Sequence, residues 1–139
     1  MTNVGIQFES RDAGEVRLDR TGKPEFPKLS TTPGVYAFRF ASHEGTMTVY
    51  VGEAENLQRR AAHYRNPGPS QATNIRLNER TRSHLASNGR ITMLLIAGAR
   101  VEIDGNIEEC DLSKTFTRRI FENAALLVTA KSGQKVENL

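Results

Sequence analysis

Two short strings that each join a glycine to a tyrosine constrain this chain most. Gly34-Val35-Tyr36 opens the apolar run Gly-Val-Tyr-Ala-Phe-Arg-Phe, and Tyr50-Val51-Gly52 ends the run Met-Thr-Val-Tyr-Val-Gly. Valines and aromatic residues favour strands, and the Ala-Ser-His-Glu-Gly-Thr segment between the two runs has the composition of a turn. The pattern predicts a β-hairpin that presents Tyr36 and Tyr50 near each other.

A helix is predicted directly after the second string. Asn56 has the side chain of an N-cap, and the Asn-Pro-Gly-Pro segment at 66–69 ends any helix that begins there. Arg60 and Tyr64 lie between these signals, four positions apart, so they share one helix face. The sequence thus predicts a helix with a guanidinium and a third phenol on one side.

The ordered set of these residues resembles the GIY-YIG nuclease family. The family has Gly-Ile-Tyr and Tyr-Ile-Gly where this chain has its two strings, each with one Ile-to-Val change. The family's arginine lies ten positions after the second motif tyrosine, with His or Tyr one turn later, which matches Arg60 and Tyr64. A glutamate in a later helix and an asparagine near the domain end match Glu122 and Asn138. The resemblance extends from about Pro33 to the C-terminus.

The resemblance implies a metal-dependent DNA endonuclease that hydrolyses phosphodiester bonds. Glu122 would anchor Mg²⁺ (or Mn²⁺), since a hard cation held by one carboxylate, waters and phosphate oxygens is typical of magnesium sites. Arg60 would bind the scissile phosphate through its bidentate charged donors. The phenols would position or deprotonate the attacking water, and Asn138 would orient a neighbour or contact the phosphate. The implied catalytic residues are Tyr36, Tyr50, Arg60, Tyr64, Glu122 and Asn138.

These residues also have a structural interpretation. Tyr36 and Tyr50 would then be packing residues of the hairpin. Glu122 would form an ion pair with Arg118 or Arg119 on its own helix. The presence of all the motif members together favours the catalytic interpretation.

Basic residues concentrate in the middle of the chain. From Glu53 to Arg100 there are eight arginines and three glutamates, whereas Val101 to Asp111 contains five acidic residues and no basic one. A basic segment is typical of contact with phosphates, and a solvated helix face gives the same pattern. The residues expected to contact nucleic acid outside the catalytic set are Arg59, His63, Arg76 and Arg80.

Two functions are consistent with these residues. The first is the endonuclease, with DNA as substrate and RNA as a further possibility. The second is a catalytically weak nucleic-acid-binding or interaction module on the same scaffold, since fold and activity can separate. Glu53 stands where many relatives have a lysine or a small polar residue, and its carboxylate would either repel phosphate or join the metal shell. Targeting would come from the N-terminal extension, the loops, self-association or a protein partner.

Composition limits the remaining classes. The chain has 139 residues, of which 37% are hydrophobic and 25% charged, as expected for one globular domain. No apolar run is long enough for a transmembrane helix, and the N-terminus lacks the pattern of a signal peptide. Cys110 is the single cysteine, so it cannot form an intrachain disulfide. We therefore expect a cytoplasmic protein without a membrane partner.

The remaining patterns predict an α/β (α+β) fold, with a small, mostly antiparallel central sheet flanked by helices. We expect one domain over residues 1–139, in which 1–30 form an extension outside the family resemblance. Residues 4–20 suggest a short hairpin that turns at Asp12 and Gly14, and three prolines make 21–33 a loop.

The second half of the chain adds strands and two helices. A helix should start at Ser70 or Thr73 and close at Asn88-Gly89. Ile91–Ala97 has the continuous apolar run of a strand buried on both faces, and Val101–Cys110 is either a small hairpin or an acidic loop.

A third helix is predicted from Lys114 to about Lys131, with Ser113 as its cap, followed by a short strand at 136–139. Two adjacent apolar stripes predict a broad buried face and a central place in the core. The stripes contain Phe116, Ile120, Ala124 and Leu127, and Phe121, Ala125 and Val128.

Overall fold

The computed structural model describes residues 1–137 and 139. In this part of the chain, seven strands form one sheet in the order β2-β1-β5-β3-β4-β7, with β6 paired to β5. Every pairing is antiparallel except that of β7 with β4. The predicted α+β fold with a mostly antiparallel sheet is therefore confirmed. The elements are β1 (Val4–Leu18), β2 (Pro24–Glu25), β3 (Gly34–Ala41), β4 (Met47–Ala54), α1 (Leu57–Arg65), α2 (Ala72–Ala86), β5 (Arg90–Ile103), β6 (Asn106–Glu109), α3 (Thr115–Lys131) and β7 (Lys135–Val136).

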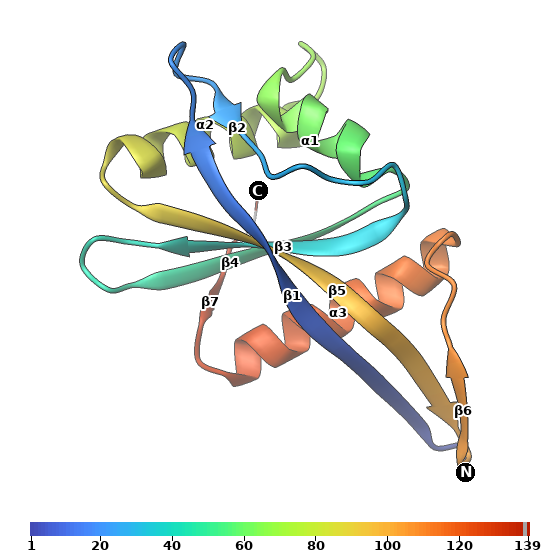
Figure 1. The fold of residues 1–139 in the computed structure, drawn as a ribbon. Coiled ribbons are helices and arrows are strands. Elements are labelled where there is room, and N and C mark those ends of the chain that lie inside the picture. The colour runs from blue at the N-terminus through green and yellow to red at the C-terminus, as the bar shows by residue number, and fades with distance from the viewer. Residues whose placement is uncertain (138) are drawn as a thin grey trace.

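Helices cover the two faces of the sheet unequally. Figure 1 shows α1 and α2 on one face and α3 alone on the other, with β1 and β5 crossing the whole molecule between them. Phe38 and Leu77 belong to the core under α1 and α2, whereas Val35 and Phe121 are buried on the α3 side. None of the helices in the described residues is long and apolar enough to cross a membrane.

The predicted motif hairpin and the helix after it are confirmed. Strands β3 and β4 pair from Gly34↔Ala54 to Ala41↔Met47 around the predicted turn. The side chain of Asn56 accepts a hydrogen bond from the backbone N–H of Arg59 at 2.9 Å, so Asn56 is the N-cap of α1. The helix ends at Arg65, before the Asn-Pro-Gly-Pro segment.

The predicted hairpin in residues 4–20 is wrong. These residues form one continuous strand, β1, which pairs along its length with β5. Asp12 and Gly14 lie at an irregularity of this ladder, where the Asp12 side chain accepts from the Gly14 N–H at 2.8 Å and Gly14 has a φ of +123°. The segment from Asp12 to Gly14 forms a β-bulge instead of a turn, because β5 is long enough to pair with β1 on both sides of this segment.

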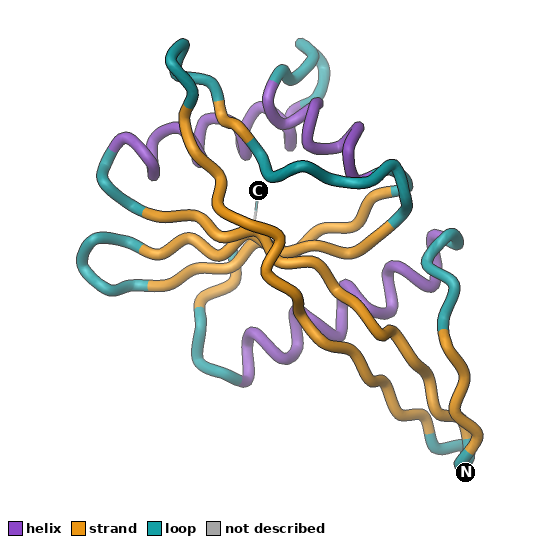
Figure 2. The backbone as a smooth tube through the Cα atoms, viewed as in Figure 1, coloured by secondary structure: helices purple, strands orange, loops and turns teal. Residues whose placement is uncertain are grey.

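The strand predicted at 91–97 is confirmed and extends further, since β5 continues to Ile103. It then turns through Asp104 and Gly105, both at positive φ, into β6. Of the two alternatives for 101–110, the hairpin is therefore correct. Strands β1, β5 and β6 continue past α3 as a three-stranded extension of the sheet, which we call the arm. Figure 2 shows the arm projecting from the body, with the N-terminus at its end.

Two predictions for α3 are wrong. Ser113 does not cap the helix, because its hydroxyl donates to Asp111 at 2.6 Å and Lys114 takes the N-cap position without a side-chain bond. The helix also lies against the sheet on one side only. Phe121 is fully buried, but one predicted stripe faces outward because no other described element covers that side. Phe116, Ile120 and Leu127 of that stripe are exposed, as is Val128.

Candidate active site

The three tyrosines meet in one aromatic cluster between the sheet and α1. Because Tyr36 pairs with Gly52 and Phe38 with Tyr50, both motif tyrosines project from the same face of the hairpin. The Phe38 ring lies at the centre, with ring centroids 5.5 Å from Tyr36, 6.5 Å from Tyr50 and 5.9 Å from Tyr64. The expectation that the hairpin brings Tyr36 and Tyr50 near each other is confirmed.

The two motif glycines are required by packing. A Cβ on Gly52 would lie 2.5 Å from the Tyr36 hydroxyl oxygen, so the Tyr36 side chain occupies the space that a side chain on β4 would need. A Cβ on Gly34 would lie 2.9 Å from Cδ1 of Leu57, the first residue of α1. One glycine therefore lets Tyr36 lie across β4, and the other lets α1 begin close to β3.

Side chains outside the motif hold α1 in place. The Asn78 amide on α2 donates to the Tyr64 carbonyl at 2.8 Å, and Arg65 pairs with Asp19 and donates to the Pro24 carbonyl at 2.9 Å. The sequence analysis did not identify Asn78 or Arg65. The signal for Asn78 was available, because an asparagine directly after an apolar residue in a helix needs a hydrogen-bond partner once it is buried.

The phenols and Arg60 form a connected polar group inside this aromatic cluster. The hydroxyls of Tyr36 and Tyr64 are hydrogen-bonded to each other, and Arg60 Nη1 donates to the Tyr36 hydroxyl at 3.5 Å. Tyr36 and Tyr64 are each only 1% exposed, whereas Tyr50 and Arg60 are half-buried. A molecule bound from solvent would therefore reach Tyr50 and Arg60 first, with the other two phenols behind them.

The environment disfavours ionisation of Tyr36 and Tyr50. Burial, and then the neighbouring Tyr64, raise the pKa of Tyr36 and of Tyr50 above the ordinary value for a tyrosine. Burial also works against the charged form of Arg60, but Tyr36 and Tyr64 outweigh it and raise the pKa of this guanidinium. The cluster thus presents one permanent positive charge and neutral hydroxyls that donate and accept hydrogen bonds.

Glu122 approaches this group from α3, on the other side of the sheet. Burial and then the nearby Glu53 raise the pKa of Glu122, whereas Arg119 and Arg60 act in the opposite direction. Within the described residues, Glu122 forms no ion pair with either Arg118 or Arg119 on its helix. The ion pair with Arg118 or Arg119, which was the structural interpretation of Glu122, is therefore not formed.

Arg118 instead binds Glu53. Its side chain is 4% exposed, its Nε lies 2.5 Å from Glu53 Oε2, and its Nη1 donates to the carbonyls of Leu112 and Ser113 at 3.0 Å. Glu53 directly follows the second motif string on β4, so this ion pair ties α3 to the strand that carries Tyr50. The sequence analysis considered Arg118 only as a partner for Glu122 and missed this role.

The residues present are compatible with a weakly held divalent cation. No group of three or more His, Cys, Asp or Glu side chains that could hold a metal ion occurs in the described part of the chain. The candidate ligand is Glu122, a half-buried carboxylate. Burial and the nearby Glu53 carboxylate disfavour its negative charge, which a bound cation would offset. Magnesium is commonly held by one or two carboxylates, with waters and substrate oxygens as its other ligands.

Two of the predicted nucleic-acid contacts flank Arg60. His63 is half-buried and, with Arg60 and the first residues of α2, lines an open pocket of about 350 Å³. Arg59 is exposed and lies 3.9 Å from Glu55. Both side chains border the solvent-facing side of α1.

The other two predicted contacts differ from each other. Arg76 is exposed on α2, with Nη2 3.3 Å from the Thr73 hydroxyl. Arg80 lies over the Phe40 ring at 4.7 Å from its centroid, and its Nε donates to Glu137 at 3.0 Å. Arg80 is therefore engaged within the protein and fixes the segment after β7. Asn138, the remaining predicted site residue, lies outside the described residues.

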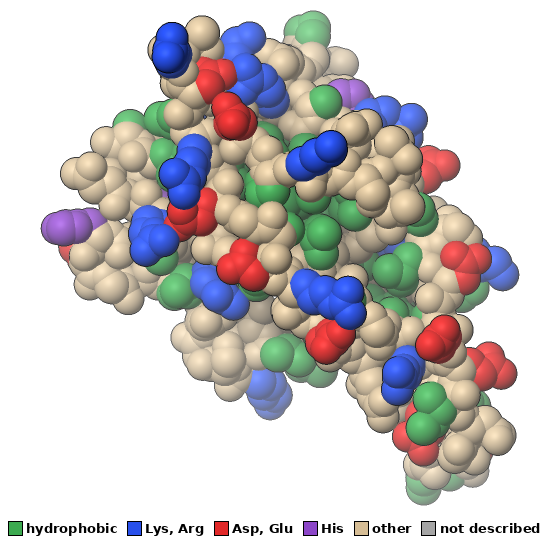
Figure 3. All heavy atoms as spheres, in the orientation of Figure 1, with side chains coloured by type: hydrophobic (Ala, Val, Ile, Leu, Met, Phe, Trp, Pro, Cys, Tyr) green, Lys and Arg blue, Asp and Glu red, His purple; other side chains and the backbone are tan. Residues whose placement is uncertain are grey.

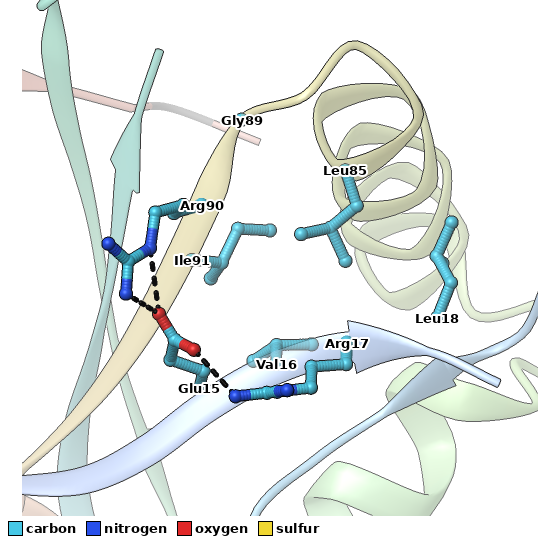
Figure 4. Close-up of a pocket in the computed structure, with 8 residues that line it drawn as sticks. All are labelled: Glu15, Val16, Arg17, Leu18, Leu85, Gly89, Arg90 and Ile91. Atoms are coloured by element: carbon cyan, nitrogen blue, oxygen red, sulfur yellow. Dashed lines mark hydrogen bonds and ion pairs between the residues drawn. The ribbon is translucent and has the colours of Figure 1, made fainter. Parts of the chain in front are cut away.

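Another pocket, of about 280 Å³, lies away from the tyrosines between β1, β5 and α2. Figure 4 shows Glu15 at its edge, bound to Arg90 and to Arg17. These ion pairs hold the pKa of the Glu15 carboxyl below its ordinary value, with Arg90 as the main cause. One carboxylate is therefore shared by two guanidinium groups at this pocket.

None of the known protein-family models, curated proteins or solved structures compared with this chain matches it.

Proposed function

We propose that this protein is a metal-dependent DNA endonuclease with a GIY-YIG-type site. The observation that carries the proposal is the convergence of three groups from three elements at one edge of the sheet. Arg60 from α1, Tyr50 from β4 and Glu122 from α3 lie close enough for each to influence a neighbour's ionisation. A cation, a hydroxyl and a carboxylate are the groups that phosphodiester hydrolysis requires.

Each group has a distinct task in this proposal. Arg60 binds the scissile phosphate and stabilises the charge that develops on its oxygens. Tyr50, the most accessible of the three phenols, orients the attacking water. Tyr36 and Tyr64 are positioning residues that hold the Arg60 guanidinium through the buried hydrogen bonds. Glu122 would hold Mg²⁺ or Mn²⁺, which supplies Lewis acidity to the phosphate when bound.

Basic and polar groups around α1 support nucleic acid as the substrate. Arg59 and His63 flank Arg60, and the pocket beside it opens toward the start of α2, near Arg76. Phosphate contacts of this kind position a backbone without reading its sequence. DNA is the substrate that we propose, and RNA is the comparison substrate in the assay.

A cleavage assay tests the proposal. Supercoiled, linear, branched and single-stranded DNA, and a matched RNA, are incubated with the protein in Mg²⁺, Mn²⁺ or chelator. We expect metal-dependent cleavage that Glu122→Gln abolishes while the melting temperature is retained. Glu79→Gln, at an exposed glutamate of α2, is the matched control and should cleave normally.

Three results would overturn the proposal. Cleavage by Glu122→Gln at the wild-type rate would remove Glu122 from the site. Cleavage in chelator would exclude the metal. Binding of DNA without cleavage under every condition would assign the chain to the alternative, a nucleic-acid-binding module.

A further inference from the structure

A small pocket lies on the α3 side of the sheet, between the central strands and the C-terminal half of α3. Its volume is about 130 Å³. Most of the side chains that line it are apolar, and they come from four strands and the helix: Phe8 of β1, Ala37 of β3, Val49 of β4, Ile96 of β5 and Ala125 of α3. Apolar cavities of about 150 Å³ can hold a benzene molecule. The space therefore suits an apolar group of about that size.

Arg39 brings a positive charge to this apolar pocket. It lies on β3, two positions after Ala37 and on the same face, and its half-buried side chain is part of the pocket lining. Its Nε is buried and has no hydrogen-bond partner in residues 1–137 and 139. No carboxylate in this part of the chain forms an ion pair with its guanidinium. The charge of Arg39 is therefore withdrawn from water without a partner.

The other arginines of the protein are not left in this state. Along β1, arginines alternate with glutamates that bind them, and Figure 3 shows basic and acidic side chains alternating over the front of the molecule, where β1 lies in Figure 1. Every other arginine that is buried or half-buried in the described residues bonds to a carboxylate or a phenol: Arg60, Arg65, Arg80 and Arg118. Because a charge out of water is costly unless it is paired, the partner of Arg39 is to be sought outside the chain.

The carboxylate in the same row of the sheet is already bound. Arg39 pairs with Thr92 of β5, which pairs in turn with Glu15 of β1, so Glu15 lies on the same face two strands away, at about 10 Å. Arg90 and Arg17 both bind the Glu15 carboxylate (Figure 4). This region of the sheet thus holds three guanidinium groups and one carboxylate. The excess positive charge favours an anion.

We propose that this pocket binds a small carboxylic acid whose apolar body is about the size of a benzene ring. The carboxylate accepts hydrogen bonds from the Arg39 guanidinium, and the apolar body fills the space under α3. A phosphate needs several donors. The hydroxyls of Thr129 and Ser132, which also line the pocket, already donate to backbone carbonyls of α3 at 2.9 Å and 2.8 Å. Tyr50 projects from the opposite face of the sheet, so this proposal is independent of the proposed function.

Binding of benzoate to the full-length protein, measured by isothermal titration calorimetry, tests the proposal. We expect a Kd of about 1 mM or tighter, which a ligand of this size can reach. Benzyl alcohol offers the ring without the charge, and acetate offers the charge without the ring. Each should bind about tenfold or more weakly than benzoate, because each lacks one of the two contacts. Inorganic phosphate should not displace benzoate.

Variants locate the bound benzoate. Arg39→Gln should weaken its binding about tenfold or more, because the variant removes the charge and the bidentate donors. Arg82→Gln is the matched control, since Arg82 also has no ion pair in the described residues but is exposed on α2. It should bind benzoate like wild type. Ala125→Leu fills the pocket and should abolish binding, and its melting temperature reports whether it is folded.

Absence of benzoate binding at concentrations well above the expected Kd would overturn the proposal. Wild-type affinity in Arg39→Gln, or in folded Ala125→Leu, would place the benzoate elsewhere on the protein. Equal affinity for benzyl alcohol and benzoate would show an apolar pocket to which Arg39 contributes nothing. Equal affinity for acetate or phosphate would show an unselective anion contact. If Ala125→Leu does not fold, the comparison of Arg39→Gln with Arg82→Gln still decides.

Discussion

The two faces of the sheet bury polar groups in different ways. Under α1 and α2, the buried hydroxyls of Tyr36 and Tyr64 form a hydrogen bond with each other, and the half-buried Arg60 donates to the Tyr36 hydroxyl. Under α3 the most buried polar group is a full charge: the Arg118 side chain is 4% exposed and pairs with Glu53, whereas the arginines of the ion pairs Arg65–Asp19 and Arg80–Glu137 on the first face are 34% and 30% exposed. Neutral groups lose little on burial once hydrogen-bonded, whereas a charge requires its partner. The α3 face should therefore be the more sensitive to loss of one side chain.

The largest effect is expected at the ion pair. Arg118→Ala leaves the Glu53 carboxylate, whose side chain is 20% exposed, without its partner, and we expect a loss of up to about 3–5 kcal/mol in unfolding free energy. Denaturant unfolding measures the loss. The double variant Arg118→Ala with Glu53→Gln should recover part of it, because no unpaired charge remains. Equal stability of the single and double variants would show that Glu53 is hydrated rather than dependent on Arg118.

The tyrosines on the other face should separate activity from stability. Tyr50→Phe removes the accessible hydroxyl, so we expect a rate of DNA cleavage lower by about a hundredfold at an unchanged melting temperature. Tyr36→Phe removes a buried hydrogen bond and should cost about 1 kcal/mol of stability with a smaller effect on rate. Cleavage rates and melting curves of both variants are measured together. The reverse ranking would make Tyr36 the phenol that contacts the water.

Overpacking on the same face tests the motif glycine. Gly52→Ala places a Cβ against the Tyr36 hydroxyl and ring, and the β3 and β4 backbones cannot move apart without breaking their ladder. We expect a loss of about 1–3 kcal/mol. Gly34→Ala is the milder comparison, because its clash is with the end of the Leu57 side chain, which can rotate. Both variants are measured by chemical denaturation. A larger loss of unfolding free energy for Gly34→Ala than for Gly52→Ala would contradict this expectation.

The smallest effect concerns the protonation of Glu122. Its pKa is raised in the folded protein, so the folded state retains a proton that the unfolded chain has released. Glu122 therefore favours folding at low pH and disfavours it as pH rises through the folded pKa. Melting temperatures of wild type and Glu122→Gln, compared from about pH 4 to 7, should diverge in favour of the variant. Added Mg²⁺ should raise only the wild-type value at the upper end. If the melting temperatures of wild type and Glu122→Gln changed in parallel with pH, the first expectation would be contradicted. If Mg²⁺ raised both or neither of them, the second would be contradicted.

Local patterns predicted the parts of this fold that depend on neighbours in sequence. The hairpin, the Asn56 cap and the end of α1 follow from turn and cap residues within a few positions. The sequence could not show that Arg118 would bind Glu53, because the two lie 65 positions apart and each has closer candidate partners. It also could not tell a turn from a bulge at Gly14, since the outcome depends on the length of β5. Periodicity identified the apolar stripes of α3 but not which would meet the sheet.

The position of β1 has a consequence for folding kinetics. Val4 pairs with Ile103 and Val16 with Ile91, so the first strand closes onto a partner that lies 75 to 99 positions later in the chain. The motif hairpin can form from local contacts, whereas the β1–β5 ladder requires closure of a very long loop. Chains dominated by such distant pairings fold slowly. We therefore expect the hairpin to be protected early in refolding and β1 late, with the aromatic cluster incomplete until the N-terminus has docked.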